Sequence, residues 1–279
     1  IYEINIWQLS LVNESDAAPS ALISSTQWDY APTVSPDGTR LAFTSTRSGS
    51  HELWIAGSDG SSPVRLTSFT GPWTGMPNWS PDGEELVFVA RPAGQADLYV
   101  VSASGAPPRR LTSDPGDEIA PSWSRDGRSI YFGSRRSGSW EIWRLDRDGG
   151  QAIQVTTEGG YAAVESPEGK WLLYTKIDQP GIWRFPLGGG EEELLVQNLD
   201  ARDWANWTVS ANRIYYLSRL DNGEPQLAAT DLASGETTWF AHLDQHARAG
   251  ISVSPGGERL FYSRTDRRES DVMVARNLP

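Results

Sequence analysis

Short runs of alternating apolar and polar residues recur along the chain, and clusters of turn residues separate them. In one such unit an apolar run ends at Trp123, a turn spans Ser124–Gly127, and residues 129–133 alternate again. A period of two predicts β-strands rather than helices. Asp at the third turn position and Gly at the fourth favour a tight reversal, because Gly tolerates positive φ.

Two further strands complete this unit. Residues 141–145 follow a loop that contains Gly, and residues 153–156 follow the turn at Asp148–Gly150. Four antiparallel strands in about 40 to 45 residues are typical of one blade of a β-propeller.

The hairpin turn of this unit recurs at regular intervals. Its aligned third positions are separated by 45, 44, 42, 42 and 46 residues, and they are Asp37, Asp82, Asp126, Glu168, Ser210 and Gly256. The pattern therefore predicts an all-β fold, a six-bladed β-propeller of four-stranded antiparallel blades. Glu165 stands where two preceding copies have Trp79 and Trp123, and we align Trp207 to the same position in the fifth copy.

Residues 1–27 do not contain a whole repeat. Residues 4–9 match a third strand and residues 21–24 match a fourth strand, whereas residues 271–274 match another third strand. We expect residues 21–24 to complete the last blade, so that an N-terminal strand closes the ring. Residues 4–9 are then surplus, and we interpret them as the remnant of an upstream blade. The alternative is a fifth strand on the closing blade.

This interpretation predicts a single propeller domain over residues 1–279. Residues 1–27 supply closing strands and residues 28–279 supply six blade repeats. The surplus strand further predicts that the chain is the C-terminal part of a longer protein.

Composition excludes several classes of function. A net charge of −12 argues against direct binding of nucleic acid, because phosphate contacts need clustered Lys and Arg. The absence of Cys rules out disulfides and thiolate metal sites. No run of about 18 apolar residues occurs, so we expect no insertion into a membrane. A monomer is the expected state.

The repeat resembles a known type. Pro77–Gly83 followed by an alternating strand, together with Glu141–Trp143 and Arg110–Thr112, is similar to the Pro-Asp type of WD-like repeat in TolB-like propellers. The chain departs from this pattern at Glu165, at residues 210–212 and at Gly256, which weakens single blades without changing their number.

The resemblance implies several possible roles. TolB is a periplasmic platform for protein interactions, with an added N-terminal domain. The well-kept repeats look more like the C-terminal propellers of bacterial winged-helix transcriptional regulators. Such repeats also precede the hydrolase domain of prolyl-oligopeptidase-type enzymes, and oligogalacturonate lyases are propellers with a metal site. The resemblance therefore implies a bacterial protein, with the periplasm favoured over the cytoplasm.

Most of the candidate chemistry has a structural explanation. The turn carboxylates recur once per blade, so they cannot share one site, and we assign them to turn geometry. The third-strand acids Glu52, Asp97 and Glu141 are expected to form exposed ion pairs of small worth. Their partners would be Arg47, Arg135 and Arg136.

Catalytic and metal motifs are weak. His242 and His246 flank Asp244 and Gln245, which is a poor metal motif because no further ligands stand at fixed spacing. No Gly-x-Ser-x-Gly elbow occurs. We predict no catalytic residue, no metal and no cofactor.

The loops that lead into the first strands are the best candidates for a binding site, because they converge on one mouth of the central channel. They differ between repeats while the strands do not, as expected when scaffold and site are separate. The candidate ligand-binding residues are Trp28, Asp29, Tyr30, Trp73, Asp117, Glu118, Tyr161, Asp203, Trp204, His246 and Arg248. In the alternative interpretation, Trp28, Trp73, Tyr161 and Trp204 only cap the blades and plug the channel.

Two hypotheses of function follow. The first is a non-catalytic propeller that binds a protein or peptide partner, or senses a small ligand, at the channel mouth. The second is an enzyme that acts on carbohydrates or peptides through residues at the same mouth.

Overall fold

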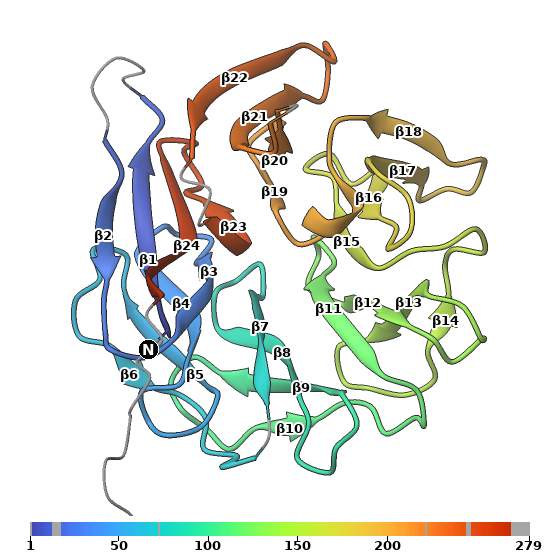
Figure 1. The fold of residues 1–279 in the computed structure, drawn as a ribbon. Coiled ribbons are helices and arrows are strands. Elements are labelled where there is room, and N and C mark those ends of the chain that lie inside the picture. Colours follow the sequence, from blue (N-terminus) through green and yellow to red (C-terminus); the bar gives the residue numbers. More distant parts are fainter. Residues whose placement is uncertain (1, 13–17, 72, 221, 244–246, 269–279) are drawn as a thin grey trace, which may run out of the picture.

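Six four-stranded antiparallel sheets stand around a central channel in the computed structural model (Figure 1). The structure describes residues 2–12, 18–71, 73–220, 222–243 and 247–268. The first strand of each sheet lies next to the channel, and the later strands lie progressively further out. The fold is therefore an all-β, six-bladed propeller, as the repeat predicts.

The first three blades follow one another in sequence. Blade 1 consists of β3 (Asp29–Val34), β4 (Arg40–Ser45), β5 (Glu52–Gly57) and β6 (Val64–Arg65). Blade 2 consists of β7 (Thr74–Trp79), β8 (Glu85–Ala90), β9 (Asp97–Ser102) and β10 (Arg109–Arg110). Blade 3 consists of β11 (Glu118–Trp123), β12 (Ser129–Ser134), β13 (Glu141–Asp146) and β14 (Ile153–Gln154).

The remaining blades include the one that joins the two ends of the chain. Blade 4 consists of β15 (Ala162–Glu165), β16 (Trp171–Thr175), β17 (Ile182–Pro186) and β18 (Glu193–Val196). Blade 5 consists of β19 (Trp207–Ser210), β20 (Arg213–Arg219), β21 (Pro225–Asp231) and β22 (Thr237–His242). Blade 6 consists of β23 (Ala247–Val253), β24 (Arg259–Arg268), β1 (Tyr2–Ser10) and β2 (Ser20–Ile23).

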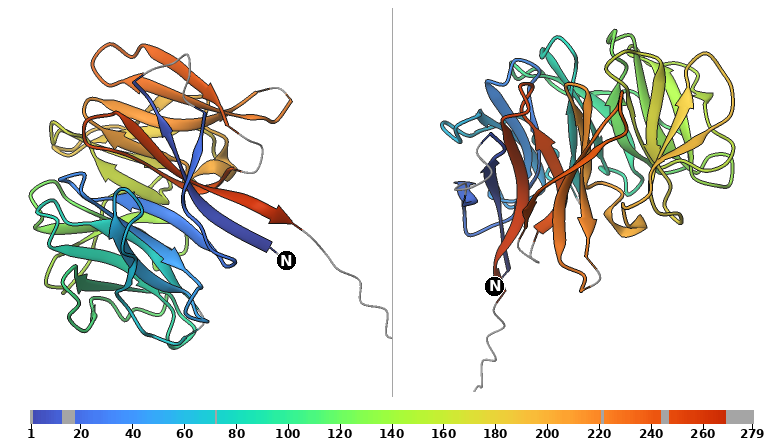
Figure 2. Two further views of the ribbon diagram at one scale, coloured as in Figure 1. Left: turned by 90° about the vertical axis from the view of Figure 1, so that its left-hand side faces the viewer. Right: turned by 90° about the horizontal axis from the view of Figure 1, so that it is seen from above.

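Two strands from each end of the chain build blade 6. β1 pairs with β24 from Tyr2–Arg268 to Ser10–Arg259, and β2 pairs with the other edge of β1. Figure 2 shows these strands, blue and red, side by side. The prediction of an N-terminal closing strand is confirmed, but the interpretation of residues 4–9 as the remnant of another blade is wrong. They form the third strand of blade 6, where Ile6 is buried in the hydrophobic layer between blades 6 and 1. The third strand predicted at 271–274 lies outside the described residues.

The hydrophobic core is divided into six layers, one between each pair of neighbouring blades. Ala42 of blade 1 packs with Trp79 of blade 2, and Phe261 of blade 6 packs with Phe43 of blade 1. Burial of such side chains contributes about 1.5–3 kcal/mol each. Each blade therefore depends on its neighbours, which explains why the ring must close.

In blades 2, 3 and 4 the last residue of the first strand is matched to the side chain that it meets on the preceding blade. Trp79 and Trp123 lie against small residues of the preceding second strand, and their indole N–H groups donate to the carbonyls of Thr33 (3.0 Å) and Asn78 (3.2 Å). In blade 4 the preceding residue is Tyr131, and its hydroxyl donates to Glu165 (2.7 Å). Glu165 thus replaces Trp in the link between blades.

The fifth blade departs from the predicted alignment. Its hairpin turn contains only Ala211 and Asn212 between β19 and β20, and Ala211 has a φ of 50°. Val209 pairs with Ile214, as Trp123 pairs with Ile130. The counterpart of Trp123 is therefore Val209, and the alignment of Trp207 to that position is wrong. The shorter turn shifted the sequence alignment by two residues.

The turn carboxylates have the structural role that their repetition predicts. The Asp37, Asp82 and Asp126 carboxylates each accept a backbone N–H two residues further on, at 3.0 Å. Hydrogen bonds from the Ser35 hydroxyl and from Thr39 lower the pKa of Asp37 to about 2. These contacts fix the turns, so Asp37, Asp82 and Asp126 have a structural role.

Helix is almost absent from the described part of the chain, where the single 3₁₀ turn η1 (Ala201–Asp203) is the exception. None of the described residues lies in a helix that is long and apolar enough to cross a membrane.

Candidate functional site

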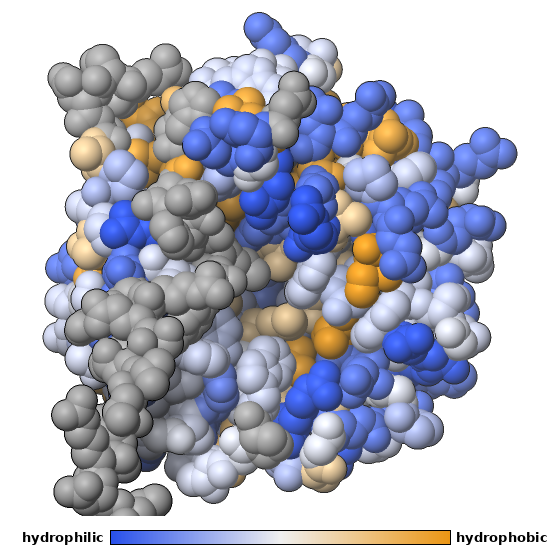
Figure 3. Space-filling model, viewed as in Figure 1, coloured by the Kyte–Doolittle hydropathy of each residue, from blue (hydrophilic) through white to orange (hydrophobic). Residues whose placement is uncertain are grey.

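A cavity of about 250 Å³ lies in the central channel at the end where the first strands begin. All six first strands contribute to it, and Tyr30, Trp73 and Trp204 stand among its lining residues. Among the described residues that line it, none carries a charged side chain, although the protein has a net charge of −12. Figure 3 shows apolar, orange surface beside the middle of this face, with hydrophilic, blue surface around it.

Four neighbouring first strands are bulged where they line the cavity. Register shifts occur after Tyr30, Gly75, Ile119 and Arg248. Next to these shifts, Ala31, Met76 and Ala120 have φ values of 52°, 56° and 46°. Such backbone conformations cost non-Gly residues about 1–3 kcal/mol and concentrate at functional sites. The bulges are thus an independent sign that this channel wall is specialised.

The first aromatic group at the mouth comes from blades 1 and 2. The Trp73 indole N–H donates to the Tyr30 hydroxyl (3.0 Å), and that hydroxyl lies 2.9 Å from Nδ1 of His51. The Trp28 ring meets His51 edge-on at 5.9 Å between centroids. Burial raises the pKa of Tyr30 to about 12, although the Trp73 hydrogen bond lowers it. Tyr30 therefore stays protonated.

The second aromatic group comes from blades 3, 4 and 5. The Tyr161 ring contacts Trp140 and Trp204 edge-on, with centroids 4.8 and 4.6 Å apart. Gly133 permits this arrangement, because a Cβ at that position would lie 2.3 Å from the Tyr161 carbonyl oxygen. In a ring of six, blades 1 and 2 lie across from blades 4 and 5. The two aromatic groups therefore face each other across the mouth.

Three acidic residues predicted to bind a ligand are buried beneath the mouth. Asp29 and Glu118 are fully buried, and Asp203 is nearly so. Ion pairs join Asp29, Glu118 and Asp203 to Arg47, Arg136 and Arg219 respectively. Asp29 and Glu118 begin the first strands of their blades and Asp203 lies in η1 just before β19, and each arginine lies at or just after the end of the second strand of the same blade. In this structure they position the mouth and do not line its cavity.

The third-strand acids were expected to be exposed, and this expectation is wrong. Glu52 accepts a hydrogen bond from the Thr67 hydroxyl (2.6 Å), and Glu141 accepts one from the Thr156 hydroxyl (2.8 Å). Glu52, Asp97 and Glu141 are all buried. The partners of Glu52 and Glu141 are threonines just beyond the short fourth strand, which sequence spacing did not indicate. The predicted partner arginines bind the first-strand acids or, for Arg135, lie over the Trp140 ring.

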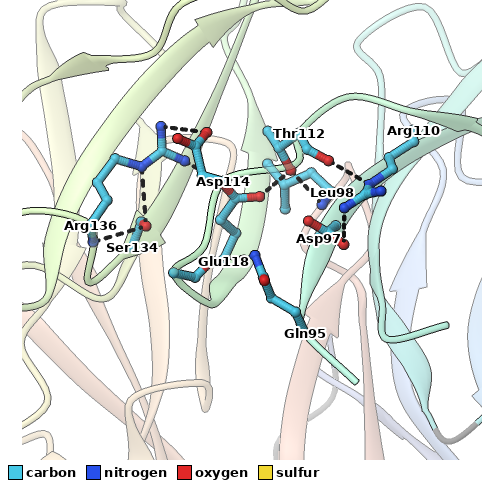
Figure 4. Close-up of polar contacts among 10 residues, drawn as sticks. Gln95, Asp97, Leu98, Arg110, Thr112, Asp114, Glu118, Ser134 and Arg136 are labelled. Carbon is cyan, nitrogen blue, oxygen red and sulfur yellow. Dashed lines mark hydrogen bonds and ion pairs between the residues drawn. The ribbon is translucent and has the colours of Figure 1, made fainter. Parts of the chain in front are cut away.

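In blade 2 the third-strand acid does not bind the threonine beyond the fourth strand, and Glu118 of blade 3 binds that threonine instead (Figure 4). Asp97 is one methylene shorter than its counterparts and pairs with Arg110 (2.7 Å). The Thr112 hydroxyl donates to Glu118 instead, and Arg136 also binds Glu118. One oxygen of Asp97 is buried without a hydrogen-bond partner in the described part of the chain. The network joins blades 2 and 3.

Burial raises the pKa of Glu118 to about 7, although Thr112 and Arg136 oppose that shift. The folded protein then binds this proton more tightly than the unfolded chain does. The free energy of unfolding should fall as pH rises from about 4.5 to 7, by up to about 1.4 kcal/mol per pH unit. Glu118→Gln should lack this contribution. Urea unfolding of both proteins from pH 4.5 to 8 measures the difference, and parallel pH profiles would contradict the prediction.

The remaining predicted site residues lie at different distances from the cavity or outside the described residues. Asp117 lies at the rim, where it pairs with Arg91 (3.3 Å) and accepts the backbone N–H of Ala96. Trp28 is partly exposed and does not line the cavity. Arg248 belongs to β23, and His246 lies outside the described residues.

The metal hypothesis at His242 and His246 falls mostly outside the described part of the chain. Among the described residues, no group of three or more His, Asp or Glu side chains could hold a metal ion.

Two residues of the mouth, His51 and Trp140, were missed by the sequence analysis. Both lie just before a third strand, at the end of the loop from the second strand. In an antiparallel blade this loop and the start of the first strand lie at the same end. The alternation of strand direction along the chain is therefore the sequence signal that places them at the mouth.

Solved structures with the same fold are numerous. A putative TolB from Agrobacterium tumefaciens has a TM-score of 0.76 and 20% identity, with 96% of this chain and 100% of that chain covered. TolB from Acinetobacter baumannii has a TM-score of 0.65 and 18% identity, with 93% and 63% covered. A puromycin-hydrolysing peptidase from Mycobacterium tuberculosis has a TM-score of 0.59 and 16% identity, with 90% and 45% covered. At these identities the likeness concerns the fold alone.

A match to the sequence model of a known family shows more than these structural likenesses do. The TolB beta propeller domain family, PD40, matches residues 7–202, which is more than half of the chain. The matched range includes seven of the eleven predicted mouth residues, from Trp28 to Tyr161. This chain belongs to the TolB beta propeller family.

Proposed function

We propose that this chain is a non-catalytic binding propeller that holds an uncharged segment of a protein partner at its channel mouth. The observation that carries the proposal is the cavity, whose described lining residues are all uncharged and whose rim bears aromatic groups on opposite sides. Tyr and Trp are enriched where proteins bind one another, because they combine a large apolar surface with a polar tip.

The chemistry of the lining limits the occupant. A charged group that entered the cavity would lose water without gaining an opposite charge, which is costly. A neutral side chain or a turn of backbone avoids that cost and can use the hydroxyl, amide and carbonyl groups of the inner strands. Bulged strands also leave the regular ladder incomplete at this point, which supports the presence of a binding surface.

The biological setting is proposed from the family. We expect a bacterial protein, with the periplasm favoured over the cytoplasm, that acts as a monomer and does not bind nucleic acid itself. Two points stay predictions from the sequence. They are the likeness to the propellers of transcriptional regulators and the position of this chain as the C-terminal part of a longer protein.

Selection of peptides tests the proposed function. A random linear peptide library displayed on phage would be selected on the wild-type protein and depleted on an Ala162→Trp variant, whose new side chain fills the cavity. Ala106→Trp is the matched control, because Ala106 is exposed on a loop outside the cavity. We expect enriched peptides with neutral anchor residues, at least tenfold weaker on the Ala162→Trp variant and unchanged on the control.

Two outcomes would overturn the proposal. Peptides that bind all three proteins equally would place the interaction elsewhere on the surface. Turnover of peptides or neutral polysaccharides, abolished by Ala162→Trp, would favour the alternative of an enzyme with its site at this mouth.

A further inference from the structure

The Tyr30 hydroxyl makes two contacts that together define where its proton lies. An indole N–H can only donate, so the Tyr30 oxygen accepts from Trp73. The tyrosine's own proton is then free to be donated, and Nδ1 of His51 lies 2.9 Å away, in position to accept it. His51 is therefore neutral at this site, with Nδ1 unprotonated and its proton on Nε2.

Protonation of His51 would break this arrangement. A charged imidazole carries N–H on both nitrogens and can only donate. The Tyr30 oxygen would then accept from both Trp73 and His51, and its own proton would have to turn away from His51. Tyr30 cannot relieve the conflict by ionising, because it remains protonated across the physiological range.

The surroundings of His51 favour its neutral form. Burial beside Trp28 and Tyr30 lowers the pKa of His51, and the adjacent Glu52 opposes that shift. The other charges of this corner are paired, since Arg47 of the same loop binds Asp29 of β3. Trp73 from blade 2 is uncharged. Between the folded pKa and 6.5 the unfolded chain binds more protons, so the folded arrangement loses stability as pH falls through that window.

We propose that His51 is a pH-dependent switch at the channel mouth, called the latch below, because its protonation state decides whether Tyr30 stays in place. Neutral His51 holds Tyr30 against Trp73 and keeps the aromatic wall of blades 1 and 2 in place. Protonated His51 releases Tyr30, and the wall loses its shape. If the mouth is the binding site proposed above, the partner is held at neutral pH and released in acid.

Nitrogen NMR of the histidine side chains tests the latch without any ligand. The wild-type protein and the variants His51→Gln and Tyr30→Phe would be titrated from pH 8 to 5, with His51→Gln identifying the His51 signals. We expect an unprotonated Nδ1 at pH 8. The midpoint should lie below 6.5 in the wild type and rise in Tyr30→Phe, because the lost hydrogen bond stabilised the neutral ring.

The Trp73 indole signal supplies the second readout. It should move with the His51 midpoint in the wild type and stay still in both variants, with Trp73→Phe identifying it. A proton on Nδ1 at pH 8, or a Trp73 signal indifferent to the titration, would overturn the latch.

Binding of an enriched peptide separates the latch from the proposed function. The latch predicts binding about threefold to tenfold weaker at pH 5 than at pH 8 in the wild type, and no such change in His51→Gln. Equal loss in both proteins would contradict the latch while leaving the binding site intact. Failure of any peptide to bind at either pH would contradict the proposed function and leave the NMR result to decide the latch.

Discussion

Replacing Arg136 by Met should destabilise the propeller by about 3–5 kcal/mol at pH 8.5. Arg136 is largely buried and binds the fully buried carboxylate of Glu118, as well as Asp114 at 3.2 Å. Without the guanidinium, the pKa of Glu118 would rise further, so at pH 8.5 the buried carboxyl would either carry an unpaired charge beside Asp97 or take up a proton, and both cost stability. Urea unfolding of the variant and the wild type measures the loss.

Two comparison variants isolate the cause. Arg128→Met removes an exposed arginine whose nearest carboxylate is 3.9 Å away, so it should change stability by less than about 1 kcal/mol. The double variant Glu118→Gln with Arg136→Met removes both charges and should recover most of the stability. A double variant as unstable as Arg136→Met alone would show that packing, rather than charge, is responsible.

Ile6→Ala should cost about 2–5 kcal/mol, because Ile6 is fully buried in the layer between blade 6 and blade 1. The residue lies on β1, and it packs with Ile23, Phe43 and Phe261. Its effect reports how far the N-terminal strands contribute to closing the ring. Thermal and urea unfolding measure it.

Val12→Ala provides the matched control. Val12 belongs to the same N-terminal region, but its side chain is 64% exposed, so the change should stay within about 0.5 kcal/mol. If residues 4–9 were a loosely attached remnant, Ile6→Ala and Val12→Ala would have the same small effect.

The number and kind of the blades were predictable because each blade repeats one hairpin chemistry at nearly constant spacing. The place of residues 4–9 was not, since residues 271–274 carry a similar third-strand pattern. Both segments suit one position beside β24, and only tertiary pairing distinguishes them. The fifth blade was misaligned because its turn is shorter and Trp207 mimics the expected residue.

The candidate site was predictable in part. Aromatic residues at the starts of first strands do gather at one mouth, and Tyr30, Trp73 and Trp204 line its cavity. The acids among them were misjudged, because whether a carboxylate faces solvent or a neighbouring arginine depends on distances between strands. The exchange of partners between Asp97 and Glu118 depends on a single methylene group, which no repeat pattern reveals.

The most direct measurement concerns the mouth itself. Each of the 13 Trp residues gives one indole N–H signal in a nitrogen–proton NMR spectrum, and Phe variants assign them. Trp73 and Trp204 line the cavity at the proposed mouth, whereas Trp79 and Trp123 line the opposite end of the channel. Adding an enriched peptide should shift the signals of Trp73 and Trp204 and leave those of Trp79 and Trp123 unchanged. Shifts confined to Trp79 and Trp123, or to Trp239 on the outer strand β22, would contradict the account.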